Sequence, residues 1–185
     1  MAIASQTGRA DRHRLIVAGL LLGIGLGAFV DGMLFREILQ LHGMLSARLP
    51  RVDVDAQTAL ANVETGMLWD GLVSAFAWTT TVLGLVLLWR ATQRASAPLP
   101  TRTWFGSMAL GWGLFDLVEG VLDHHVLQIQ HVTESPNHLV WDLAFLAWGC
   151  VLAGLGGALI RVPGSDVEAA DREPIPRPTP REVTR

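Results

Sequence analysis

Four long apolar segments alternate with polar stretches along the chain. Each is close to the roughly 20 residues that an α-helix needs to cross the hydrocarbon core of a bilayer, and they cover residues 15–38, 66–89, 104–127 and 138–160. Glycine recurs within these segments, which in lipid is typical of closely packed helices. The pattern therefore predicts an all-α fold, a bundle of four transmembrane helices over residues 15–162.

Arginine is unevenly distributed between the connecting segments, and positive residues favour the cytoplasmic side of a membrane protein. The loop at 128–137 contains no lysine or arginine, and the loop after the first segment contains only Arg48 and Arg51. Apart from Arg36 inside the first segment, the other arginines precede the first segment, separate the second from the third, or follow the fourth, and include Arg9, Arg12, Arg14, Arg90, Arg94, Arg102 and Arg161. This distribution predicts that both termini are cytoplasmic (N-in/C-in).

The two ends and one loop complete the predicted organisation. Residues 1–14 are expected to form a cytoplasmic N-terminal segment. Residues 163–185 contain "PIPRPTPREVTR", and their proline-rich, charged composition predicts a disordered cytoplasmic tail. Residues 51–64 are expected to form a short surface helix outside the membrane.

Composition supports a membrane protein and narrows the range of partners. Half of the residues are hydrophobic and the mean hydropathy is positive, so the lipid bilayer is the expected partner. The net charge of −3 argues against nucleic acid as a partner. The single Cys150 excludes zinc and iron–sulfur motifs that need several cysteines. The oligomeric state is left open by all of these properties.

Carboxylates occur in the outer half of every predicted helix. They include Asp31, Asp70, Glu119, Asp123 and Asp142, and Asp116 is expected near mid-membrane. A charged side chain inside a spanning helix is costly unless it is paired, so it tends to mark a functional site. Four separate helices place such a residue at a similar depth, which predicts a buried site near the extracytoplasmic face.

The spacing of these acids also brings them near histidines. At about 100° per residue in an α-helix, Asp116, Glu119 and Asp123 share one face of the third helix. The other expected alignments are His124 with His131, provided that the third helix continues, Asp31 with His42, and His138 with Asp142, whereas His125 points away. These alignments predict one convergent cluster.

Carboxylate oxygens and neutral imidazoles are ligands for divalent transition metals. The expected function is therefore a buried site for zinc, iron or manganese, within a membrane metalloenzyme if the bound metal activates water. Asp70 and Glu119 are the candidate catalytic residues, in the role of general base. The predicted metal ligands are Asp31, His42, Glu119, Asp123, His124, His131 and Asp142.

Other interpretations of the same residues stay open. Copper is one, because methionines lie toward the outer side and His42 stands two residues before Met44, which suits Cu(I). A second is a non-catalytic polar network that joins the helices without a metal, with Arg36 supplying a fixed positive charge to an acid. Proton or ion conduction and haem ligation by two histidines are the remaining ones.

Four motifs in order carry a resemblance to a known family. They are "FVDGMLFREILQLHGML", "WDGLVSAFAW", "GWGLFDLVEGVLDHHVLQIQHV" and "WDLAFLAWG", within residues 27–149. They resemble a bacterial family of small four-helix integral membrane proteins of unknown function, which is sometimes joined to CtaG-like cytochrome c oxidase assembly domains. The positions at which that family often shows histidine are here Arg36, Gly43, Val73 and Gln130.

The resemblance implies a location and an alternative function. The location is the bacterial cytoplasmic (inner) membrane, with several spans. The alternative function is handling of a metal, copper above all, or assembly of a respiratory oxidase, whose components would then be partners. The residues that match the family pattern are Asp31, His42, Asp70, Glu119, Asp123, His124, His125, His131 and Asp142.

Overall fold

The computed structural model of the chain describes residues 2–50, 52–95, 99–133 and 135–161. Helix α1 covers Ala2–Val30 and continues as the π-helix η1 at Asp31–Ile38. Helix α2 covers Ala56–Arg94. Helix α3 covers Thr101–Glu119 and continues as the π-helix η2 at Gly120–Val126, and α4 covers His138–Arg161. No strand occurs among the described residues, so the all-α prediction is confirmed. The predicted tail at 163–185 lies outside the described residues.

All four long helices are long and apolar enough to cross a membrane. The longest is α2, whose 39 residues extend about 58 Å at about 1.5 Å per residue, beyond a hydrocarbon core about 30 Å thick. Residues 56–64 of the short surface helix expected at 51–64 are helical, but they are the first part of α2 and continue into it without a break. The first helix also begins earlier than expected, at Ala2 rather than at residue 15.

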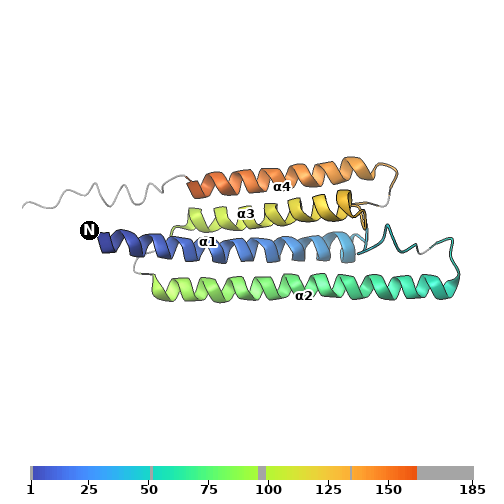
Figure 1. Ribbon diagram of the computed structural model, residues 1–185, viewed down its shortest axis with the longest axis horizontal. Helices are drawn as coiled ribbons and strands as arrows, with labels where there is room; N and C mark the ends of the chain where they lie inside the picture. Colours follow the sequence, from blue (N-terminus) through green and yellow to red (C-terminus); the bar gives the residue numbers. More distant parts are fainter. Residues whose placement is uncertain (1, 51, 96–98, 134, 162–185) are drawn as a thin grey trace, which may run out of the picture.

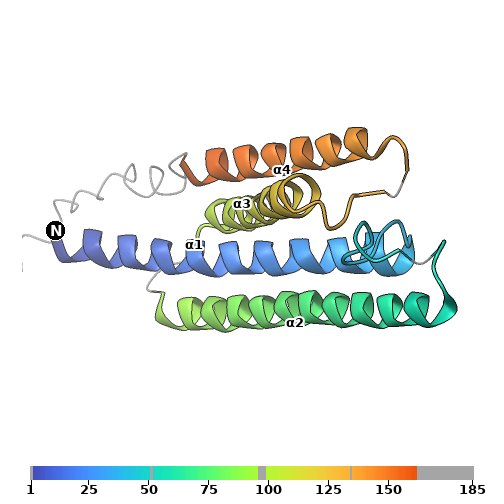
Figure 2. The same ribbon diagram turned by 45° about the vertical axis from the view of Figure 1, so that its right-hand side comes forward.

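The helices lie side by side in the order α2, α1, α3, α4, as Figure 1 and Figure 2 show. Helix α1 packs against α2 and α3, and α3 also packs against α4. Among the described residues, α2 and α4 each pack on only one long helix. Apolar side chains on their outer faces, such as Trp78 and Val140, are consequently exposed, as expected of surfaces that meet lipid.

Glycine allows the central helices to approach closely. A Cβ atom built on Gly111 of α3 would lie 2.2 Å from the carbonyl oxygen of Leu20 on α1, and one on Gly113 would lie 2.4 Å from the backbone nitrogen of Ala153 on α4. No larger residue fits either contact without separating the helices, because backbone atoms cannot move aside. The prediction of close packing through glycine is thus confirmed for both faces of α3.

Both π-helices end before the histidines that were expected to lie in the same helices. The first membrane helix ends at Ile38 and the third at Val126, and Gln40 and Gln128 then adopt left-handed backbone conformations, with φ of 51° and 48°, that are typical just beyond a helix end. His42 and His131 therefore lie in loops, and their predicted helical alignments with Asp31 and His124 are wrong.

The loops that contain these histidines contact each other at the end of the molecule opposite the N-terminus (Figure 1). The backbone N–H of Ala47 donates to the carbonyl oxygen of Ile129 at 3.2 Å. The guanidinium of Arg48 donates to the carbonyl oxygen of Leu127 at 2.8 Å. These bonds hold the loop after η1 and the loop after η2 together beside the ends of these two helices.

Candidate functional site

The acids of the four helices gather at this loop end of the molecule, as predicted, but they form two clusters rather than one. We call the first the arginine–carboxylate cluster, which consists of Asp31, Arg36, Asp70 and Glu119. We call the second the histidine–aspartate cluster, which consists of His124, His131, His138 and Asp142.

A buried arginine joins the carboxylates of the first cluster. Arg36 Nη2 donates to Asp31 Oδ2 at 2.6 Å and lies 3.6 Å from Glu119 Oε1, and Arg36 Nη1 lies 3.6 Å from Asp70 Oδ1. The side chain of Arg36 is only 3% exposed. The predicted alternative in which Arg36 supplies a positive charge to an acid therefore agrees with the structure, and three helices contribute acids to this one cation.

The π-helical geometry of η1 explains why Arg36 meets Asp31. A π-helix joins residue i to residue i+5, so side chains five positions apart lie on one face, as Asp31 and Arg36 do. In an α-helix these positions would be about 140° apart. α-Helical periodicity does not align these two residues, so the sequence indicated the pairing only as an alternative, and Arg36 was not among the predicted metal ligands.

Two further hydrogen bonds attach the first cluster to the loops. The backbone N–H of Met44 donates to Asp70 Oδ1 at 2.9 Å. The side-chain amide of Gln130 donates to Glu119 Oε1 at 3.1 Å and is itself fully buried. The predicted catalytic residues Asp70 and Glu119 thus each use one oxygen, Oδ1 and Oε1, to contact both Arg36 and a loop group.

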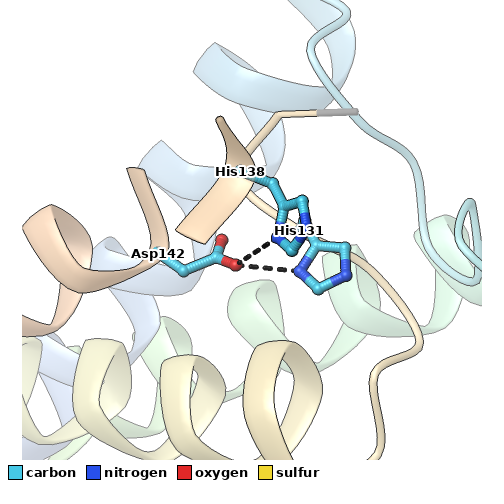
Figure 3. A group of neighbouring side chains, drawn as sticks. All are labelled: His131, His138 and Asp142. Atoms are coloured by element: carbon cyan, nitrogen blue, oxygen red, sulfur yellow. Dashed lines mark hydrogen bonds and ion pairs between the residues drawn. The ribbon is translucent and has the colours of Figure 1, made fainter. Parts of the chain in front are cut away.

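The second cluster centres on the buried carboxylate of Asp142 near the start of α4. Its Oδ1 accepts a hydrogen bond from the backbone N–H of Val132 at 2.9 Å and lies 3.4 Å from His124 Nδ1. Its Oδ2 lies 2.8 Å from His131 Nδ1 and 3.5 Å from His138 Nδ1, and Figure 3 shows both rings directed at this oxygen. The predicted pairing of His138 with Asp142 is confirmed.

Within the described residues, the group formed by His131, His138 and Asp142 brings three potential ligand atoms within 4.8 Å of one another. Nitrogen and oxygen ligands at about 2.1 Å from one ion, at tetrahedral or octahedral angles, are about 3.0–3.4 Å apart. The separations of 2.8 and 3.5 Å from Asp142 are within a few tenths of an ångström of that range. Two of the three separations in the group are therefore close to those around a single ion, and the third is within 4.8 Å.

The structure places the remaining predicted site residues around these clusters. His42 is buried in the loop after η1, and Asp123 is half-buried on η2. His124 turns inward, whereas His125 Nδ1 contacts the carbonyl oxygen of Gly120 at 2.9 Å. His138 was not among the predicted ligands, although its spacing of four residues from Asp142 was the signal that could have included it.

Two cavities lie beside the clusters. One, of about 420 Å³, is between α1, α3 and α4 and is lined by residues that include Asp31, Asp116 and Val132. The other, of about 340 Å³, is between α2 and α3 and is lined in part by Glu119 and Asp123. Both are of the size that small-molecule ligands occupy, and both have mostly apolar walls.

Comparison with known proteins gives a family but no function. The model of the family described as "Predicted membrane protein (DUF2243)" matches residues 18–162. This span contains most of α1, all of α2, α3 and α4, and every residue of the two clusters. No curated protein and no solved structure matches the chain.

Proposed function

The chain belongs to the DUF2243 family of predicted membrane proteins, and from this premise we propose that it binds a divalent transition metal through His131, His138 and Asp142. The observation that carries the proposal is the convergence of two imidazoles on one buried carboxylate oxygen. His124, 3.4 Å from the other oxygen, is a candidate fourth ligand.

The difference in charge between the clusters supports this choice of ligands. In the first cluster Arg36 already provides a permanent positive charge to three carboxylates. In the second cluster the partners of Asp142 are histidines and a backbone N–H, none of which is permanently charged. A metal ion would supply the missing charge, and it would leave Asp31 and Glu119 outside the ligand set.

The proposed metal belongs to the set predicted from the sequence. Imidazole and carboxylate suit zinc, iron and manganese. Three protein ligands leave a coordination position for water or substrate, as is typical of catalytic sites. The side chain of His138 is 43% exposed, so the cluster is reachable from outside the protein.

The proposal includes a location and a catalytic form. We place the protein in the bacterial cytoplasmic (inner) membrane with both termini inside, which puts both clusters at the extracytoplasmic face. As a metalloenzyme it would use the metal to activate water.

A second candidate needs no metal. Asp142 accepts the backbone N–H of Val132 at 2.9 Å and pairs with His131 at 2.8 Å, and both partners lie in the loop at 127–137. The same carboxylate can therefore serve to hold this loop against α4 as part of a polar network. Buried carboxylates that accept several hydrogen bonds are stable without an ion.

Elemental analysis of protein purified in neutral detergent tests the proposal. We expect wild type to retain about one zinc, iron or manganese ion per chain, and His138→Gln and Asp142→Asn to lose it. His125→Gln is the matched control, because His125 contacts the Gly120 carbonyl oxygen outside the cluster, and it should retain the metal.

The alternatives predict other results. Absence of metal from wild type, even after incubation with each ion, would support the polar network. Copper in wild type, lost in the same variants, would favour metal handling for a respiratory oxidase over the enzyme. Metal that survives His138→Gln and Asp142→Asn would contradict the proposed ligands.

A further inference from the structure

The larger cavity has apolar walls and an acidic base. It has a volume of about 420 Å³ and lies between the end of the first membrane helix, α3 and α4. Its charged lining residues are Asp31 and Asp116, and no basic side chain contributes to its described lining. The cavity is therefore negative at the positions where it is polar.

Asp116 is the charged residue of this cavity that has a carboxylate oxygen without a hydrogen-bond partner. It is 1% exposed, and its Oδ2 has no hydrogen-bond partner among the described residues. Trp112, one turn earlier on the same helix, donates a hydrogen bond to its carboxylate. Asp31 differs, because Arg36 already donates to it at 2.6 Å. A buried acceptor without a donor is costly, so a ligand that brings a positive charge or a donor to Asp116 would be stabilised.

Aromatic rings make up much of the remaining wall. Trp112 and Phe145 lie inside, whereas Trp141 and Trp148 on α4 are each 54% exposed and so form the mouth. The faces of aromatic rings attract cations, tryptophan most strongly, and cages of such rings recognise alkylated ammonium groups. Aromatic walls around a buried carboxylate thus favour an organic cation over a neutral apolar molecule.

We propose that this cavity binds a small organic ammonium ion, with its charge near Asp116 and its apolar groups against the tryptophans. The volume suits such a molecule and is larger than a bare metal ion needs. The only group of described residues that gathers three metal-ligating atoms is His131, His138 and Asp142, none of which lines the cavity. The ammonium site is therefore separate from the proposed metal site and does not depend on it.

Calorimetric titration with phenyltrimethylammonium, in neutral detergent with EDTA, tests this site. The matched control ligand is tert-butylbenzene, which has nearly the same shape without the charge. We expect wild type to bind the cation at least about tenfold more tightly than the neutral compound. EDTA removes any contribution from bound metal, and His138→Gln should bind the cation as wild type does.

Variants then assign the binding to these residues. Asp116→Asn keeps the size of the side chain and should lower the affinity for the cation at least about tenfold while leaving that for tert-butylbenzene unchanged. Glu64→Gln removes the same charge from an exposed position on α2 and should have no effect. Trp141→Leu, at the exposed mouth, should weaken binding even if Asp116→Asn does not fold.

Two results would overturn the proposal. One is that wild type binds the cation no more tightly than the neutral compound. The other is that both Trp141→Leu and a folded Asp116→Asn bind it as wild type does.

Discussion

The two clusters at the loop end of the molecule differ in how their negative charge is balanced. The arginine–carboxylate cluster contains its own permanent cation, Arg36, whose side chain is 3% exposed. In the histidine–aspartate cluster, no partner of Asp142 carries a permanent positive charge, and the side chain of its most exposed member, His138, is 43% exposed. The comparison suggests a division of roles, in which the first cluster holds the helices together and the second remains able to accept a ligand.

The π-helices η1 and η2 provide one residue or more to each cluster. Arg36 and Asp31 come from η1, and His124 comes from η2. Such segments are uncommon and occur frequently at functional sites. Here they direct inward some side chains that an uninterrupted α-helix would direct elsewhere. The irregular backbone therefore helps to form the clusters.

The largest expected effect is on the first cluster. Arg36→Met should lower the free energy of unfolding by about 3–5 kcal/mol, because it leaves buried carboxylates without their cation. Thermal unfolding in detergent, followed by circular dichroism, measures this. Arg14→Met is the control, since Arg14 pairs with Asp11 at the surface with a side chain 47% exposed, and such pairs contribute about 0–1 kcal/mol.

A double variant sharpens the first prediction. Arg36→Met combined with Glu119→Gln should recover part of the lost stability, because one of the uncompensated charges is removed. Equal stability of Arg36→Met and wild type would mean that the arginine does not balance these acids, and the contrast between the clusters would then fail.

The next largest effect concerns the second cluster. A divalent transition metal at about one hundred times its dissociation constant should stabilise wild type by about 2.7 kcal/mol, seen as a higher melting temperature. His138→Gln should abolish this increase, and Glu64→Gln should keep it. An equal increase in His138→Gln would show that the metal binds elsewhere.

Packing between α3 and α4 should affect the histidine–aspartate cluster in particular, because that cluster contains residues of η2, which continues α3, and of α4. Gly113→Ala would place a Cβ atom 2.4 Å from the Ala153 nitrogen and 2.5 Å from the Gly149 oxygen, and should cost about 1–3 kcal/mol. It should also weaken metal binding, by separating His124 from Asp142. Gly154→Ala on the same helix pair meets nothing within 4 Å and should be near neutral. Similar melting temperatures for these two variants would contradict the close contact.

The fold was more accessible from the sequence than the site. Apolar runs and their length decide where spanning helices form, so the four helices could be predicted, as could the gathering of acids at one end. The division into two clusters could not, because it depends on π-turns that shift the register at Asp31 and Gly120. The continuity of α2 through residues 56–64 was missed because that polar stretch lacks the apolar pattern that marks a span.

The contribution of His131 was also beyond sequence periodicity. It reaches Asp142 from a loop, and the hydrogen bond from the Val132 N–H to Asp142 at 2.9 Å holds that loop in place. A loop conformation that depends on tertiary hydrogen bonds leaves no periodic signal. The i, i+4 spacing of His138 and Asp142 does leave one, which is why that pair could be found.

The smallest expected effect concerns Asp55, which lies outside both clusters. Asp55 precedes α2 and accepts hydrogen bonds from the Thr58 hydroxyl and from the backbone N–H groups of Thr58 and Gln57. The Thr58 hydroxyl foremost, followed by the Thr58 backbone N–H, lowers the pKa of Asp55 below 3.8. The ionised carboxylate therefore stabilises the helix start fully above that value, and this stabilisation is lost as the pH falls through the lowered pKa.

Asp55→Asn keeps the capping oxygen but cannot ionise, so it isolates this effect. The melting temperature of wild type should exceed that of the variant slightly at pH 6, and the difference should disappear as the pH is lowered below about 3.8. A difference between wild type and Asp55→Asn that stays constant with pH would show that shape rather than charge caps α2.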